Sequence, residues 1–223
     1  TVPFVSKATN VPLAQIATGI ALGRKLKDYK LKKWSTNNHI AVKKPVFPFN
    51  KFPNENIFLG PEMKSTGEVM GIAPEFGDAF SKAIMGDGNQ LPMKGKAFIS
   101  VNDFDKPKLI PIAKDLLNLG FKILATKGTA EFLIKENLQV DTIYKVGEGR
   151  PNTLDGIKNK EISLVINTPL GAQSRFDENS IGIAATQVRI PVLTTLSAAQ
   201  ALIKAIKSNN KNQVRSIQEI HNS

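Results

Sequence analysis

The stretch Phe-Lys-Ile-Leu-Ala-Thr-Lys-Gly-Thr-Ala-Glu, residues 121–131, decides the fold because it reads as a strand that turns directly into a helix. Phe121–Ala125 is a short apolar run typical of a buried strand, and Ala130–Leu138 carries apolar residues at helical spacing. A helix that follows such a turn has free backbone N–H groups at its start, where the peptide dipoles favour an anion. The turn Thr126–Thr129 adds two hydroxyls and a glycine that lets a ligand approach the backbone. The stretch therefore predicts a phosphate or carboxylate site, although the threonines of an ordinary strand–helix turn would also serve as helix caps.

Strands and helices alternate regularly on both sides of this stretch. Strands are predicted at residues 96–101, 121–125, 142–146, 162–166 and 191–194, and a last strand at 214–220. Helices are predicted at residues 108–119, with Pro111 in the first turn, and at 130–138, 153–158, 179–188 and 198–208. This alternation predicts an α/β fold with a mainly parallel sheet covered by helices on both faces, and ligands bound at the carboxyl ends of the strands.

Polar residues follow the predicted strands at the edge where ligands are expected. The stretch Asn102–Lys106 follows the first strand, and Thr194 follows the fifth. The candidate binding residues are Lys106, Thr126, Lys127, Gly128, Thr129, Lys145, Asn167, Thr168 and Thr194. Lysines, hydroxyls and an amide suit a phosphate ester with a polar head group, and the set lacks a nucleophile–base pair for catalysis. Threonine and asparagine are also common turn residues, and the lysines also fit plain surface charges.

The first part of the chain has a different pattern. Residues 1–6 are apolar and strand-like, a helix is predicted at 11–27, and 39–49 is extended. An ordered loop at 50–66, a strand at 67–72 and a helix at 74–85 follow. Three glycines and a proline then fall within residues 86–95, which makes this segment the best domain boundary. We therefore predict two domains, 1–90 and 91–223.

Composition excludes several classes of function. The 223 residues contain no cysteine, which excludes disulfides and thiolate sites, and only His39 and His221, which argues against a histidine metal cluster. The formal charge of +11 is spread over both parts of the chain, its densest cluster lies at residues 24–33, and aromatic residues are only 7%. We therefore predict no nucleic-acid partner. Without an apolar run of roughly 20 residues, we predict no membrane partner and a cytoplasmic location.

Several motifs resemble one family of enzymes. Leu59-Gly-Pro-Glu-Met-Lys-Ser-Thr-Gly-Glu-Val-Met-Gly71, together with Pro48-Phe-Asn-Lys-Phe-Pro53 and Pro3-Phe-Val-Ser-Lys-Ala8, strongly resembles the large subunit of carbamoyl-phosphate synthetase. Three further motifs resemble the C-terminal regulatory domain of that subunit, which has a methylglyoxal-synthase-like fold. They are Thr126-Lys-Gly-Thr-Ala130, Gly149-Arg-Pro151 and Asn167-Thr168. The resemblance covers essentially the whole chain.

The resemblance implies that residues 1–90 are the end of the second ATP-grasp domain, an α+β remnant, and that 91–223 form the allosteric domain, a three-layer α/β/α structure. The implied whole protein is an ATP-dependent, glutamine-hydrolysing ligase of pyrimidine and arginine biosynthesis. This segment is expected to be non-catalytic and to hold no cofactor, whereas the full-length protein uses ATP with magnesium or potassium. The implied partners are a glutaminase small subunit and a nucleotide monophosphate effector, uridylate or inosinate; a homo-oligomer is left open. The effector would contact Lys106, Thr126, Thr129, Lys145, Asn167 and Thr168.

One property of the family and two alternative functions are not supported by the residues present. Some relatives respond to ornithine through an acidic residue where this chain has Lys44, which argues against ornithine binding. The alternative function, a methylglyoxal-synthase-type phosphate lyase, needs a carboxylate base and a pocket histidine. No histidine lies between His39 and His221, and Gly149-Arg-Pro151 stands where those enzymes carry an aspartate. The related cyclohydrolase domain of purine synthesis does not match the first 90 residues.

Overall fold

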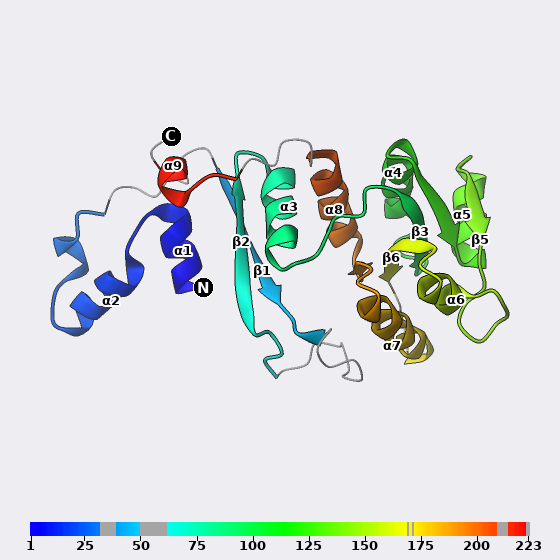
Figure 1. Ribbon diagram of the computed structural model, residues 1–223, viewed down its shortest axis with the longest axis horizontal. Coiled ribbons are helices and arrows are strands. Elements are labelled where there is room, and N and C mark those ends of the chain that lie inside the picture. The colour runs from blue at the N-terminus through cyan, green and yellow to red at the C-terminus, as the bar shows by residue number, and fades with distance from the viewer. Residues whose placement is uncertain (32–38, 50–61, 169, 171, 209–213, 222–223) are drawn as a thin grey trace.

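The computed structural model describes residues 1–31, 39–49, 62–168, 170, 172–208 and 214–221, and of residues 172–178 only the backbone (Figure 1). Four features discussed above fall partly or mostly outside these ranges: the loop at 50–66, the motifs at 48–53 and 59–71, and the basic cluster at 24–33. No helix within the described ranges is long and apolar enough to cross a membrane.

The second half of the chain forms a five-stranded parallel sheet with the strand order β5-β4-β3-β6-β7. Its strands are β3 (Gly95–Val101), β4 (Phe121–Ala125), β5 (Val140–Thr142), β6 (Ile162–Thr168) and β7 (Val192–Leu193). The helices are α4 (Lys106–Asn118), α5 (Lys127–Lys135), α6 (Thr153–Lys158), α7 (Ala172–Gln187) and α8 (Leu196–Ser208). The predicted α/β fold with a parallel sheet is confirmed.

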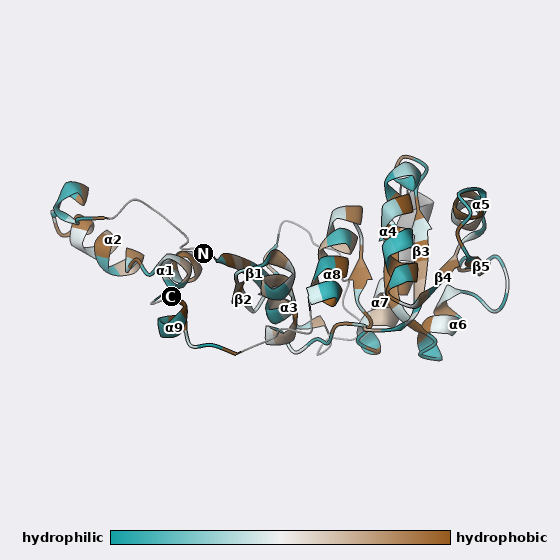
Figure 2. Cartoon of the chain, turned by 90° about the horizontal axis from the view of Figure 1, so that it is seen from above, coloured by the Kyte–Doolittle hydropathy of each residue, from teal (hydrophilic) through white to brown (hydrophobic). Residues whose placement is uncertain are grey.

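Helices cover both faces of this sheet because side chains alternate along its central strands. Ile99 of β3 packs into a core with helices α4, α5 and α8, whereas its neighbour Phe98 packs into a second core with α6 and α7. The two cores lie on opposite faces, which gives the expected three layers. In Figure 2 the helices α4 and α8 carry hydrophobic and hydrophilic stripes, as amphipathic covering helices do.

Several predicted element bounds are wrong in the parallel sheet. Helix α5 begins at Lys127, so the predicted turn is the first turn of the helix. Helix α4 begins at Lys106, which places Pro111 inside the helix; full burial of Leu109, Ile112 and Leu116 against the sheet offsets the hydrogen bond that the proline cannot donate. Helix α7 begins seven residues earlier than the predicted position 179, and β5 ends at Thr142, where its strand was predicted to begin.

Before helix α3 (Phe76–Gly86), the described residues of the first part of the chain form two helices, a 3-10 turn and a hairpin. These elements are α1 (Val2–Thr9), α2 (Leu13–Ala21), the turn Leu26–Asp28, and the antiparallel strands β1 (Ile40–Val46) and β2 (Gly67–Ala73). The prediction of a strand at 1–6 is wrong, since Pro3 lies in the first turn of α1, a position that suits proline. The helix predicted at 11–27 ends early, at Ala21, and Gly23 follows with a φ of +97°.

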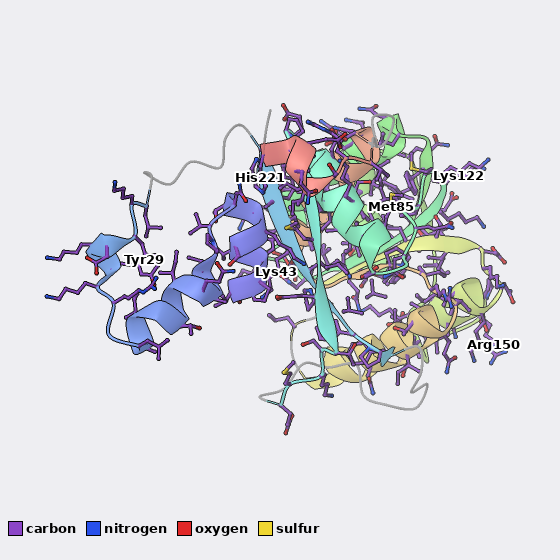
Figure 3. All side chains as sticks on the ribbon, turned by 60° about the vertical axis from the view of Figure 1, so that its left-hand side comes forward. Tyr29, Lys43, Met85, Lys122, Arg150 and His221 are labelled. Atoms are coloured by element: carbon purple, nitrogen blue, oxygen red, sulfur yellow. The ribbon has the colours of Figure 1, made fainter. Side chains whose placement is uncertain are left out.

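The C-terminal segment forms helix α9 (Ile217–His221) and not the strand predicted at 214–220. The Ser216 hydroxyl accepts the backbone N–H of Glu219, whose carboxylate accepts the N–H of Ser216, so the two residues form a capping box that the sequence contained. Helix α9 returns to α1, where Nε2 of His221 lies 2.6 Å from the Lys7 carbonyl oxygen (Figures 1 and 3). The rings of His221 and His39 also contact edge to face, with centroids 5.9 Å apart.

Helix α3 (Phe76–Gly86) connects the two halves of the molecule. It packs against the hairpin on one side and against α8 on the other (Figure 1). Both contacts are close: a Cβ atom on Gly71 would meet the backbone of α3, and one on Gly77 would lie 2.5 Å from the Lys204 carbonyl oxygen. Ile84 of α3 belongs to the same core as the parallel sheet. The two halves therefore share packing across residue 90, and the domain division there stays a prediction.

Lys44 forms an ion pair in the first part of the fold. Its ammonium group on β1 pairs with the carboxylate of Asp87, which follows the end of α3 and also accepts hydrogen bonds from Asn89. Burial lowers the pKa of Lys44. This lysine thus links the hairpin to the segment that leads into β3, and its bearing on ornithine stays a prediction.

Candidate functional site

A pocket of ≈ 320 Å³ opens at the carboxyl ends of β3, β4 and β6, the edge at which the sequence predicted a ligand. One part of its wall is polar: Ser100, Asn102, Asp103, Thr126, Lys145, Thr153, Asn167 and Thr168. The other part is apolar: Phe98, Val101, Phe104, Val146, Leu170 and Ile181. The pocket thus offers both polar and apolar contacts to a ligand.

The structure brings together most of the candidate residues. Four of them line the pocket: Thr126, Lys145, Asn167 and Thr168. Three more lie beside it: Lys127 and Gly128 are exposed in the first turn of α5, and Nζ of Lys106 lies 3.7 Å from the position that a Cβ atom on Gly128 would take. Thr194 is exposed at the end of β7 and does not line the pocket. That these residues bind an effector stays a prediction.

Hydrogen bonds fix the wall formed by Asn102. Its side-chain amide donates to the carbonyl oxygen of Thr168, at 3.1 Å, and to the hydroxyl of Thr168, at 3.2 Å. It also donates to the Asp105 carboxylate, at 2.8 Å, and its carbonyl oxygen accepts the Asp105 backbone N–H. Because one side chain joins the end of β3 to the end of β6, the polar wall is ordered before any ligand arrives.

The two threonines of the turn hold α5 to the sheet. The Thr126 hydroxyl donates to Oγ of Ser100, at 3.2 Å, and Thr126 makes no side-chain capping bond to α5. The Thr129 side chain is buried, and its hydroxyl oxygen accepts the backbone N–H of Val101, at 3.3 Å. The idea that these threonines only cap the helix is wrong for Thr126. Because its side chain does not accept the first backbone N–H groups of α5, those groups can donate to another acceptor.

Lys145 is held at the pocket by its neighbours. A bridge joins Tyr144 to Asn152, and the fully buried Thr153 donates from its hydroxyl to the Tyr144 carbonyl oxygen, at 3.2 Å. Asn152 and Asp155 form a capping box at the start of α6. The loop that carries Lys145 is therefore fixed to a capped helix. The Asn-Thr-Leu-Asp pattern at 152–155 was the sequence signal for this arrangement.

Lys106 has a counter-ion at the pocket. Its Nζ atom lies 2.7 Å from the Asp103 carboxylate, which lines the pocket and is otherwise exposed. The hydrogen bond from Lys106, together with its positive charge, lowers the pKa of Asp103. An anion that binds at the start of α5 would therefore meet Lys106 already paired with a carboxylate.

Several residues that line the pocket were not among the predicted binding residues, and Ser100, Phe104 and Thr153 are examples. Ser100 lies within β3 and Thr153 within a capping box, so neither has a sequence pattern of its own that predicts a ligand. Phe104 lies in a turn within the stretch Asn102–Lys106, and its 80% exposure is visible only in the structure.

The second half of the chain is thus an α/β domain with a parallel sheet and a pocket at the carboxyl ends of its strands. Residues 108–194 match the family model of the MGS-like domain, so this part of the chain is an MGS-like domain. Over nearly its whole length the chain is also similar to curated proteins named carbamoyl phosphate synthase large chain.

Three of these relatives show how far the similarity extends. The chain is 50% identical over 220 residues to the protein of Acidobacterium capsulatum, 46% over 221 residues to that of Nostoc sp., and 47% over 224 residues to that of Archaeoglobus fulgidus. These alignments cover 96%, 98% and 99% of this chain, and 20%, 20% and 21% of the respective relatives. The resemblance stated from the motifs is confirmed, and the chain spans about a fifth of the length of the relatives it matches.

Proposed function

We propose that this chain is the regulatory portion of a carbamoyl phosphate synthase large chain and that its pocket binds a nucleotide monophosphate. In this proposal the effector, uridylate or inosinate, controls the synthesis of carbamoyl phosphate for pyrimidine and arginine biosynthesis. The observation that carries it is the position of the pocket, between two lysines and the N-terminus of α5. The similarity to named large chains over nearly the whole chain supports the wider assignment.

The geometry at the start of α5 suits a phosphate group. The exposed first turn at Lys127 and Gly128 offers backbone N–H groups and the positive end of the helix dipole. Lys106, which is also paired with Asp103, lies beside this turn and Lys145 lines the pocket, so a dianion bound here would have two cations near it. Asn167 and Thr168 are buried at the end of β6 and supply polar atoms for the rest of the ligand.

The alternative of a phosphate lyase has less support from the pocket. A base that removes a proton beside a carbonyl works best when its pKa lies near neutral. Asp103 is the carboxylate among the described residues that line this pocket, and its pKa is shifted downward by Lys106. We favour binding over catalysis because the described residues that line the pocket include one carboxylate, which is paired with Lys106, and no histidine.

The remaining parts of the assignment are proposals of the same kind. Residues 1–90 would be the end of an ATP-grasp domain, and ATP with magnesium or potassium would act elsewhere in the full-length protein, together with a glutaminase small subunit. Among the described residues, no group of three or more His, Cys, Asp or Glu side chains is placed to hold a metal ion. We also propose a cytoplasmic location, because the cysteine-free composition needs no oxidising compartment.

Calorimetry of the chain with uridylate, inosinate and the two unphosphorylated nucleosides tests the central claim. Each hydrogen bond to a charged group contributes about 1.5–3 kcal/mol, so loss of the phosphate should weaken binding about a hundredfold or more. The variant Lys145→Ala should bind the nucleotide more weakly. Lys122→Ala should not, because Lys122 is exposed near the amino end of β4, at the opposite edge of the sheet (Figure 3). If neither nucleotide binds at millimolar concentration, or if Lys145→Ala binds both like the unmodified chain, the proposal is wrong.

A further inference from the structure

Phe104 is a large apolar side chain that the fold leaves in water at the mouth of the pocket. It is 80% exposed, and it lines the pocket. Exposure of a whole phenylalanine side chain leaves apolar surface that burial would stabilise. Leu170, which is 63% exposed, lines the same pocket from the chain that follows β6. Two exposed apolar side chains thus line the pocket together with its polar residues.

The turn that presents Phe104 is held in place on both sides. The backbone N–H of Asp105 donates to the carbonyl oxygen of Asn102, at 3.2 Å, and to its side-chain oxygen, also at 3.2 Å. The amide of Asn102 in turn donates to Thr168, two residues before Leu170. Phe104 is therefore carried by a closed, hydrogen-bonded turn that is tied to the chain bearing Leu170. The exposure of Phe104 at the pocket mouth is therefore set by these hydrogen bonds.

The same turn also carries a cation toward the expected phosphate position. Lys106 follows Phe104 by two residues, and its Nζ atom lies beside Gly128 at the start of α5. An anion bound at α5 and a flat group bound at Phe104 would therefore contact one rigid segment of five residues. Inside the mouth, Val146 and Ile181 continue the apolar wall.

From this arrangement we propose that Phe104 is a specificity-determining residue that stacks against the aromatic base of the bound nucleotide, with Leu170 adding apolar contact to the base. The inference rests on the proposed function and deepens it. It separates the ligand into a phosphate end, held at α5, and a planar aromatic end, held at Phe104. A sugar phosphate without a base would use the first part of the site alone.

The test compares inosinate, uridylate and ribose 5-phosphate by calorimetry on the unmodified chain, Phe104→Ala, Phe104→Leu and Phe104→Trp. Stacking on an aromatic side chain predicts that Phe104→Ala weakens both nucleotides about tenfold or more. Phe104→Leu should weaken them nearly as much, because it keeps apolar volume without an aromatic face. Phe104→Trp should restore binding, and ribose 5-phosphate should bind all four proteins equally. Ile134→Ala is the matched control, since Ile134 is 51% exposed on α5 and does not line the pocket.

The outcomes separate this inference from the function on which it rests. If the nucleotides bind Phe104→Ala as tightly as the unmodified chain, or if ribose 5-phosphate loses as much affinity as the nucleotides, the stacking role is wrong while the phosphate site stands. If no phosphate ester binds the unmodified chain, the proposed function fails, and the stacking role fails with it. Because Phe104 is exposed, its variants should unfold at the same temperature as the unmodified chain, which checks that each one is folded.

Discussion

The hairpin with α3 and the pocket end of the parallel sheet are held together by different contacts. In the first region, backbone meets backbone at glycines, as at Gly71 against α3 and Gly77 against α8. In the second region, side chains of Asn102, Thr126 and Thr129 hydrogen-bond across strand ends. The backbone contacts in the first region leave no space for a larger side chain at these glycines. The hydrogen bonds in the second region form an ordered polar wall. Close packing therefore serves the junction of the two halves, and hydrogen-bonded polar groups serve the binding site.

The largest effect should come from filling the closest backbone contact. A Cβ atom on Gly71 would lie 2.6 Å from the Ala83 nitrogen and closer still to the Ala79 carbonyl oxygen, both in α3. Gly71→Val would have to separate α3 from β2, and overpacking of this kind costs about 3 kcal/mol or more when backbone must move. Chemical denaturation should show this loss of unfolding free energy.

A glycine in the same strand is the control for that measurement. A Cβ atom on Gly67, also in β2, would meet nothing within 4 Å. Gly67→Val should therefore leave stability nearly unchanged. Equal stability of the two variants would contradict the close packing described for α3.

The next effect concerns the pocket end, where Thr129→Val keeps the side-chain volume and removes the hydroxyl. The buried N–H of Val101 would lose its acceptor, which costs about 1–3 kcal/mol. The loss should appear in the unfolding free energy, since the hydroxyl is engaged within the fold. The control Thr142→Val removes an exposed hydroxyl at the end of β5 and should cost much less. A Thr129→Val protein of unchanged stability would show that this bond contributes little to the fold.

A smaller effect is expected from Asp103, which occupies Lys106 in the absence of a ligand. If the proposed function holds, Asp103→Asn should tighten nucleotide binding about two- to fivefold, because the phosphate no longer meets a competing negative charge. Calorimetry measures this change, with Asp115→Asn as the control, because Asp115 pairs with Lys207 away from the pocket. Weaker binding by Asp103→Asn would mean that the carboxylate assists the ligand.

The smallest effect should come from a charged pair at the opposite end of the sheet. Lys96 lies 2.8 Å from Glu161, and this hydrogen bond together with the lysine charge lowers the pKa of Glu161. A carboxyl group whose pKa is lower in the folded state stabilises the fold above its unfolded pKa, and this contribution is lost as the pH falls through the folded value. Glu161→Gln should therefore lower the melting temperature slightly at pH 7. The difference from the unmodified chain should shrink between about pH 5 and pH 3, and a difference independent of pH would exclude this pair as its cause.

Local patterns in the sequence were sufficient for much of this architecture. The apolar run Phe121–Ala125 followed by a helix predicted β4 and α5, and the regular alternation after Lys96 predicted the parallel sheet. The polar residues after each strand predicted the pocket edge, since parallel strands end at the same side. These predictions succeeded because strand and helix periods are read within a few residues, and because sheet topology follows from their alternation.

Only the tertiary structure decided how individual residues are used. It kept Pro111 within α4 by burial of its neighbours, and it assigned the hydroxyl of Thr129 to Val101. It also packed α3 against both the hairpin and α8, and left Phe104 exposed at the pocket mouth. The physical reason is that each of these outcomes depends on contacts between residues far apart in the chain. Local propensity fixes the element, and the partner that an atom finds across the fold fixes its role.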